Sequence, residues 1–253
     1  MVAGAALEVQ RVEGAGSRPR APIVFLHEGL GSVAMWRDWP QQVCREAGRD
    51  GIVYSRRGYG RSDTVPDVRG AGRLPPDYLQ REALAALPEL LAALGIQRPV
   101  LLGHSDGGSI ALIHAGRSPV TACVVMAPHV IVEDVSVRAI AQARQAYESG
   151  ALRERLARFH ADVDCAFWQW NDVWLSPAFR GFDIRAQCRG ITAPVLAVQG
   201  EDDPYGTLRQ IEEIAPTAGP FEMVKLPQCG HSPHKDQAAA VTAHITRFLA
   251  TLD

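Results

Sequence analysis

Short apolar runs alternate with stretches of helical spacing along most of this 253-residue chain. The apolar runs are 22–26, 51–54, 99–102, 121–126, 194–198 and 221–226, and helical spacing is found in 78–94, 107–115, 207–215 and 237–252. Strands that are apolar throughout are covered on both faces, and strands that alternate with helices form parallel βαβ units. The sequence therefore predicts an α/β fold with a mostly parallel sheet flanked by helices. Residues 7–12 are expected to add an antiparallel strand, and Pro88 is expected to kink the first helix.

The segment 129–191 interrupts this alternation, because it has helical stretches but no clear strand. It carries eight aromatic side chains: Tyr147, Phe159, Phe167, Trp168, Trp170, Trp174, Phe179 and Phe182. An insertion that returns to the sheet at Pro194 is expected to form a helical cap over the carboxyl edge of the sheet. The predicted domains are a core of residues 1–128 and 192–253 and a cap of residues 129–191.

The most informative stretch is Gly103-His104-Ser105-Asp106-Gly107, which lies between an apolar strand and a helix. In this context the G-x-S-x-G pattern is typical of a nucleophile elbow, a sharp turn that exposes the serine hydroxyl at a helix N-terminus. The serine backbone must be strained there, and side chains at the two flanking positions would collide, so both are glycine. Ser105 is therefore the candidate nucleophile.

A serine hydroxyl needs a general base and an orienting carboxylate before it can attack a carbonyl. Acidic residues 201–203 follow one predicted strand, and His231 lies in the loop after the next. The carboxyl ends of parallel strands meet at one edge of the sheet, so we expect these groups near Ser105. The chain order serine, acid, histidine is the order found in α/β-hydrolases.

The chain resembles the α/β-hydrolase superfamily over nearly its whole length. Residues 25–32 resemble the oxyanion loop of the family, and residues 54–63 resemble its D-x-R-G-x-G-x-S segment. Residues 200–203 resemble the acid turn, and residues 230–234 resemble the histidine loop. The resemblance implies the α/β-hydrolase fold, a mostly parallel sheet flanked by helices with a helical cap inserted after the sixth strand.

The resemblance also implies which acid and which histidine are catalytic. The acid of the family stands three residues after the glycine of its turn, which favours Asp203 over Asp202. The family precedent assigns the base to His231, and His234 is expected to be structural. His104, directly before the serine, is expected to pack behind it.

The expected oxyanion hole consists of the backbone N–H groups of Asp106 and Gly29. The oxyanion loop of the family usually reads H-G, whereas Glu28 follows the histidine here. The loop register is therefore open, and Glu28 or Leu30 are alternatives to Gly29 as donor. The Asp106 carboxylate is read first as a stabilising acid in the first turn of a helix, and second as a group that disfavours anionic substrates.

Four further residues are candidate substrate contacts: Glu28, His129, Trp168 and Trp170. The tryptophans indicate a hydrophobic or aromatic acyl pocket, although packing inside the cap explains more than half of the aromatic residues equally well. For His129 a hinge or capping role is an equal alternative. The isolated histidines lack ligand spacing, so no metal and no cofactor are expected.

The leading interpretation is a serine hydrolase with an acyl-enzyme intermediate that acts on a small carboxylic ester or related acyl substrate. Residues 29–36 also resemble enol-lactonases and C–C bond hydrolases, so these reactions remain alternatives. A non-catalytic ligand receptor on the same scaffold is a third possibility. Dehalogenases and epoxide hydrolases have aspartate at the nucleophile position, so Ser105 argues against both.

Composition excludes several other classes. The net charge of −2 offers no basic excess for neutralising nucleic acid, and no apolar run reaches the length of a membrane span. The five cysteines are scattered without a CxxC pair, so a disulfide framework is not expected. The first twelve residues do not read as a signal peptide, and the expected location is the cytoplasm. A homodimer is compatible with the sequence, which does not determine the oligomeric state.

Overall fold

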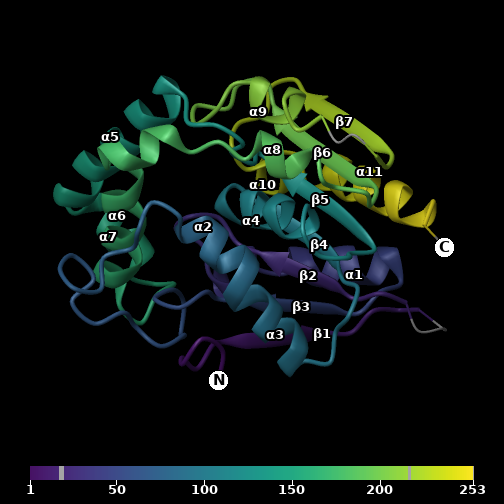
Figure 1. Ribbon diagram of the computed structural model, residues 1–253, viewed down its shortest axis with the longest axis horizontal. Coiled ribbons are helices and arrows are strands. Elements are labelled where there is room, and N and C mark those ends of the chain that lie inside the picture. The colour runs from purple at the N-terminus through teal and green to yellow at the C-terminus, as the bar shows by residue number, and fades with distance from the viewer. Residues whose placement is uncertain (17–19, 216–217, 253) are drawn as a thin grey trace.

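The computed structural model describes residues 1–16, 20–215 and 218–252 and is built around a sheet of seven strands within these residues (Figure 1). The strands are β1 (Val9–Val12), β2 (Ile23–Leu26), β3 (Gly51–Tyr54), β4 (Val100–His104), β5 (Ala122–Met126), β6 (Val195–Gly200) and β7 (Phe221–Leu226). Their order is β1-β3-β2-β4-β5-β6-β7; β1 is antiparallel to β3, and the other neighbours are parallel. This confirms the predicted mostly parallel sheet and its antiparallel first strand.

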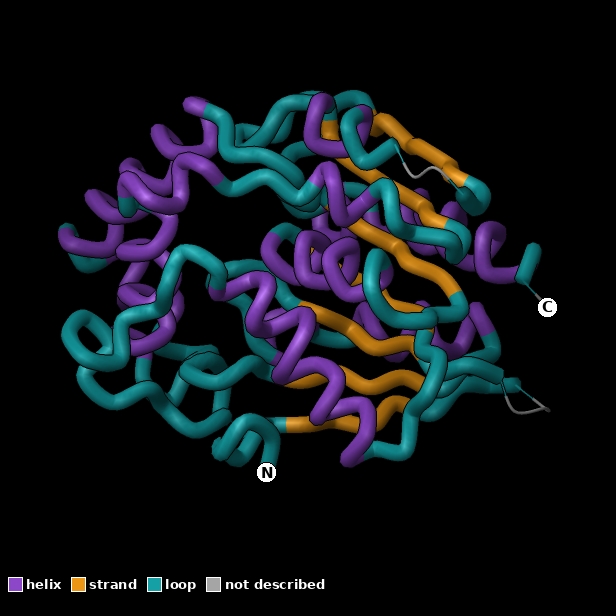
Figure 2. Tube along the Cα trace, in the orientation of Figure 1, coloured by secondary structure: helices purple, strands orange, loops and turns teal. Residues whose placement is uncertain are grey.

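Helices cover both faces of the sheet (Figure 2). One face carries α2 (Tyr78–Arg81), η2 (Glu82–Ala86), α3 (Leu87–Ala93) and α4 (Asp106–Ala115), and the other carries α1 (Trp39–Ala47) and α11 (Ala238–Ala250). In β2, Val24 and Leu26 belong to the core on the first face, and Ile23 and Phe25 to the core on the second. Successive strand side chains point to opposite faces, so an entirely apolar strand serves two cores.

The first long helix is irregular at the predicted position. The turn η2 is a π-helix, and Pro88 stands at the beginning of α3 directly after it. Proline lacks an N–H group and its ring clashes with the preceding turn, and a wider turn makes room for it. The kink expected at Pro88 thus takes the form of a π-helical turn.

The helices of segment 129–191 are α5 (Asp134–Glu148), α6 (Ala151–Leu156), α7 (Val163–Trp174), the 3-10 helix η3 (Pro177–Gly181) and α8 (Arg185–Cys188). Of these, α5, α6 and α7 form a group at the left of Figure 1, whereas α8 lies near α4 and β6. The insertion, expected after the sixth strand, follows β5, which is the fifth strand of this chain. Tyr147 and Phe167 stack with ring centroids 3.6 Å apart and join α5 to α7, so part of the aromatic content packs the segment itself.

The remaining helices are short: η1 (Val33–Trp36), α9 (Arg209–Glu212) and α10 (Pro233–Asp236). The helix expected over 207–215 is therefore reduced to the single turn of α9, and α1 and α7 were not predicted individually. Within the described residues, no helix has both the length and the hydropathy needed to cross a membrane.

Candidate active site

Ser105 occupies the turn between β4 and α4 with a strained backbone, φ 53° and ψ −119°. A β-carbon on Gly103 would overlap the carbonyl of Gly107, and one on Gly107 would overlap the carbonyl of Leu26. Both glycines are therefore required for the close approach of the backbone at this turn. The strain expected from the sequence is present at Ser105.

Ser105, His231 and Asp203 are joined by hydrogen bonds, although they come from three separate loops. The Ser105 Oγ lies 3.0 Å from Nε2 of His231, and Nδ1 of His231 lies 2.9 Å from both carboxylate oxygens of Asp203. The Tyr205 N–H also donates to Asp203 over 2.8 Å. The sequence predicted this set, and the structure brings its three members together.

The charge of Asp203 determines how His231 is oriented. Burial alone would raise the pKa of the Asp203 carboxyl, but the hydrogen bond and the charge of His231 outweigh it, so the pKa lies below its usual value. Asp203 is therefore ionised at neutral pH and accepts the Nδ1 hydrogen of His231. The other ring nitrogen, Nε2, then carries no hydrogen and accepts the hydrogen bond of the Ser105 hydroxyl.

Two further histidines pack behind this set. His104 is buried, and its Nε2–H donates to the backbone carbonyl of His231 over 2.7 Å. The His234 ring lies 4.8 Å from the His104 ring and packs on Trp36 and Trp39. Burial, followed by the charge of His104, keeps the pKa of His234 well below its ordinary value. His104 thus bonds to the loop of His231, and His234 packs between His104 and the two tryptophans; the structural roles expected for both stay predictions.

Asp106, directly after Ser105, is fully buried. Its carboxylate accepts hydrogen bonds from the hydroxyl of Tyr78 over 2.6 Å and from the indole N–H of Trp174 over 3.2 Å, and Arg56 lies 3.8 Å away. Burial raises the pKa of Asp106, while Arg56 and the two hydrogen bonds oppose the shift. The side chain is thus part of a buried polar network between α2, α4 and α7, which the helix-terminus interpretation did not include.

The loop expected to supply the oxyanion hole is fixed through His27. The His27 Nδ1–H donates to the carbonyl of Glu28 over 2.6 Å, and Nε2 accepts the backbone N–H of Arg56 over 3.0 Å. At Gly29 a β-carbon would overlap the ring of Trp170, so this position admits only glycine against that indole. The backbone of Gly29 therefore lies at the pocket, although the donor itself stays a prediction.

A pocket of about 290 Å³ opens above Ser105. Of the four predicted substrate contacts, Glu28, His129 and Trp170 line it. Trp168 does not line this pocket; its ring lies 3.8 Å from the Arg69 guanidinium instead. Residues two positions apart on an α-helix are rotated by about 200°, so Trp168 and Trp170 point in opposite directions. The prediction for Trp168 is therefore corrected.

Several lining residues were missed by the sequence interpretation: Ile140, Leu152, Arg155, Leu156, Trp174 and Tyr205. Trp174 is four residues after Trp170 and shares its helix face, a spacing that could have revealed it. His129 is buried against Trp174, with ring centroids 4.8 Å apart. Burial, together with the charge of His231, lowers the pKa of His129 to about 3, so His129 is neutral in the pocket.

Glu28 is a partly buried carboxylate at the edge of the same pocket. Burial alone would raise its pKa, but His104, 3.5 Å away, and Lys235, also 3.5 Å away, outweigh burial and keep the pKa well below its usual value. In the described parts of the chain no three His, Cys, Asp or Glu side chains are grouped as metal ligands. The five cysteines are all buried free thiols.

The fold and the glycine-bounded turn at Ser105 are those of an α/β-hydrolase. The sequence model of the Alpha/beta hydrolase family matches residues 23–244, and the chain belongs to this family. The protein named "Putative carbamate hydrolase RutD" of Variovorax paradoxus (strain S110) is 29% identical over 252 residues, covering 90% of this chain and 91% of the relative. A "Proline iminopeptidase" of Levilactobacillus brevis (strain ATCC 367) is 24% identical over 288 residues, covering 96% and 93%.

Solved structures share the fold. The enol-lactonase from Burkholderia xenovorans LB400 superposes with a TM-score of 0.74 and 21% identity, covering 98% of each chain. At this identity the likeness concerns the fold. The family model therefore places this chain among the α/β-hydrolases, a family of hydrolytic enzymes.

Proposed function

We propose that this protein is a serine hydrolase in which Ser105 is the nucleophile, His231 the general base and Asp203 the orienting acid. The observation that carries the proposal is the continuous hydrogen-bonded path from Ser105 Oγ through the His231 ring to Asp203, with contacts of 3.0 and 2.9 Å. These distances lie within the range needed for proton transfer. The strained turn at Ser105 adds support, because it presents the hydroxyl at the N-terminus of α4.

The reaction would proceed in two half-reactions. Ser105 Oγ attacks the substrate carbonyl carbon while Nε2 of His231 takes the hydroxyl proton, and the carbonyl oxygen becomes an oxyanion. The backbone N–H groups of Asp106 and Gly29 would bind this oxyanion, a contribution of about 3–4 kcal/mol for each donor. The leaving group departs with the proton from His231 and leaves an acyl-enzyme. Water then attacks the acyl carbon, His231 again accepts and returns a proton, and the acid is released.

The substrate class follows from the shape and lining of the pocket. About 290 Å³ lined by Leu30, Met35, Ile140, Trp170 and other apolar side chains accommodates a small, apolar acyl group. We infer a small carboxylic ester as the substrate, hydrolysed beneath a cap formed by segment 129–191. Carbamates are close chemical relatives of esters, and the name of the relative from Variovorax paradoxus places them in the same test panel.

The test combines covalent labelling with turnover. A fluorophosphonate probe is expected to label the wild-type protein at Ser105, and Ser105→Ala is expected to lose both labelling and at least about 10³-fold of the ester hydrolysis rate. Ser118→Ala, which changes a serine outside the pocket lining, is the matched control and should label normally. Labelling without turnover of any p-nitrophenyl ester or carbamate would favour a lactonase or C–C hydrolase. Absence of labelling would favour a ligand receptor.

A further inference from the structure

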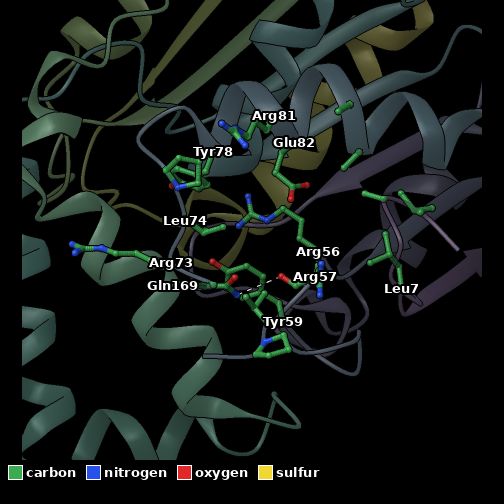
Figure 3. A pocket seen from close by; sticks show the side chains of 18 of the residues that line it. Leu7, Arg56, Arg57, Tyr59, Arg73, Leu74, Tyr78, Arg81, Glu82 and Gln169 are labelled. Atoms are coloured by element: carbon green, nitrogen blue, oxygen red, sulfur yellow. Dashed lines mark hydrogen bonds between the residues drawn. The ribbon is translucent and has the colours of Figure 1, made fainter. Parts of the chain in front are cut away.

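A second cavity, of about 500 Å³, is shown in Figure 3 and is separate from the pocket above Ser105. The two spaces share a wall. Tyr78 lines the second cavity, and its hydroxyl is hydrogen-bonded to Asp106, which lines the pocket above Ser105. On α7 the neighbouring residues Gln169 and Trp170 line the second cavity and the pocket respectively. The second cavity is the larger of the two, yet Ser105 does not line it, so the hydrolytic reaction does not account for it.

Arg56 reaches into this cavity between Glu82 and Tyr59 (Figure 3). The residue is only 2% exposed. Its Nη2 donates to the carbonyl of Glu28 over 3.0 Å, but within the described residues Nε and Nη1 have no hydrogen-bond partner. Buried donors on a charged group are costly when they lack an acceptor. The guanidinium, whose Nη2 lies 3.8 Å from the Asp106 carboxylate, therefore offers the unused donors Nε and Nη1 to a ligand in the cavity.

Tyr59 provides a second unused group next to Arg56. Its ring lies 5.0 Å beneath the Arg56 guanidinium, and its buried hydroxyl also has no hydrogen-bond partner among the described residues. A hydroxyl and a guanidinium that both lack acceptors favour a ligand group with more than one acceptor oxygen.

The charges that line the cavity favour an anion. Three other arginines line it, Arg57, Arg73 and Arg81, and Arg81 is paired with Asp77. Among the described lining residues the single acidic side chain is Glu82, and burial raises its pKa against the charge of Arg56. The lining thus has an excess of positive charge. The rest of the lining is largely apolar and includes Leu7, Val65, Pro66, Leu74 and Pro75.

We propose that this cavity is a binding site for a small molecule with an apolar body and a carboxylate, whose oxygens accept hydrogen bonds from Arg56 and Tyr59. The apolar body would lie against the proline and aliphatic side chains of the lining. The site is distinct from the substrate pocket, and it lies next to the oxyanion loop because Arg56 also binds the carbonyl of Glu28.

The probe is 4-bromobenzoate, with neutral 4-bromobenzamide of the same shape as the control ligand. Crystals of the full chain soaked with 4-bromobenzoate are expected to show a bromine anomalous peak inside the cavity. In calorimetric titration the acid should bind at least about tenfold more tightly than the amide, because the amide cannot form charge-assisted hydrogen bonds with Arg56. A peak confined to the pocket above Ser105, or equal affinity for acid and amide, would overturn the proposal.

Matched variants separate this site from the substrate pocket. Ala85→Trp places an indole at an exposed position of the cavity lining, whereas Leu84→Trp changes the adjacent residue, which is 47% exposed and outside the lining. We expect Ala85→Trp to weaken 4-bromobenzoate binding about tenfold or more and Leu84→Trp to leave it unchanged. Tyr59→Phe removes only the hydroxyl and should weaken binding about threefold to tenfold. Wild-type affinity in both Ala85→Trp and Tyr59→Phe would show that the probe binds elsewhere and would refute the assignment.

Discussion

The indole N–H of Trp174 donates to Oδ1 of Asp106 over 3.2 Å. Trp174 ends α7 in the inserted segment, and Asp106 begins the helix that follows the proposed nucleophile. Tyr78, at the beginning of α2, donates to the other oxygen of the same carboxylate. A single buried carboxylate therefore connects the inserted segment, the elbow and the first long helix.

This connection is expected to matter for stability. Tyr78→Phe leaves a buried carboxylate with one donor fewer, so we expect the free energy of unfolding to fall by about 2 kcal/mol. Tyr147→Phe is the matched control, because Tyr147 also donates to a carboxylate over 2.6 Å, but that carboxylate, Asp164, is half exposed. Its loss should cost about 1 kcal/mol or less. Urea denaturation of both variants measures the difference. If Tyr78→Phe and Tyr147→Phe lost the same free energy of unfolding, the burial of Asp106 would not strengthen its hydrogen bond.

The role proposed for Asp203 predicts a tautomer effect. Asp203→Asn keeps the shape of the side chain but removes the negative charge that holds the Nδ1 hydrogen of His231. We expect kcat on a p-nitrophenyl ester to fall by about 10³-fold or more. The control is Asp202→Asn, which changes the adjacent exposed carboxylate and should leave kcat within about twofold. If kcat fell strongly in Asp202→Asn and not in Asp203→Asn, the orienting acid would be Asp202.

The buried His129 predicts a pH dependence of stability. Its pKa of about 3 in the folded protein lies below the value of about 6.5 in the unfolded chain, so between these values the unfolded chain binds the extra proton. The contribution of the neutral His129 to the free energy of unfolding is therefore fully present above pH 6.5 and is lost as the pH falls toward 3. At pH 5 the loss amounts to about 2 kcal/mol.

His129→Phe removes this titration while keeping an aromatic ring against Trp174. Relative to wild type, the variant should gain about 2 kcal/mol of unfolding free energy when the pH changes from 8 to 5. Urea titrations at several pH values measure the gain. Parallel stability curves for the two proteins would show that His129 does not titrate as its burial implies.

The contact between Gly29 and Trp170 predicts a coupled pair. Gly29→Ala places a methyl group where the indole lies, and we expect ester hydrolysis to fall at least about tenfold as the loop is displaced. Gly29→Ala combined with Trp170→Ala relieves the overlap, so the double variant should lose less activity than the two single losses multiplied together. Gly181→Ala, at a glycine with open space around it, serves as the neutral control. If the two substitutions reduced ester hydrolysis independently, so that their losses multiplied, the predicted overlap between residue 29 and the Trp170 indole would be wrong.

The strand pattern and the three proposed catalytic residues could be predicted because they depend on local signals. Ser105 lies in a turn that demands glycine on both sides, and Asp203 and His231 each follow an apolar strand. In a parallel sheet, the ends of such strands meet at one edge, which predicts that these groups lie close together. The choice of Asp203 over Asp202 and of His231 over His234 came from the resemblance to the family.

The lining of the pocket could not be predicted in the same way. Asp106 has the local features of an acid in the first turn of a helix, and its partners Tyr78 and Trp174 are distant in sequence. Trp168 and Trp170 are the same residue type on one helix. The rotation of α7 about its axis determines that Trp170 lines the pocket and Trp168 does not. Helix rotation depends on packing between helices, and a single sequence does not encode it locally.

The hydrogen bond from Trp174 to Asp106 restricts which helix can move to admit a substrate to the pocket above Ser105. Lifting the end of α7 away from the sheet would leave the Asp106 carboxylate short of a donor, which costs about 1–3 kcal/mol. Displacing α6 would break the hydrogen bonds from Arg153 to Asp164 of α7, but both side chains are about half exposed, so this loss costs less. Leu152 and Arg155 of α6 border the pocket, and Arg155 is exposed. We therefore expect that α6 moves away from the pocket at a lower cost than α7, and that the exposed Arg155 borders the opening that such a movement creates.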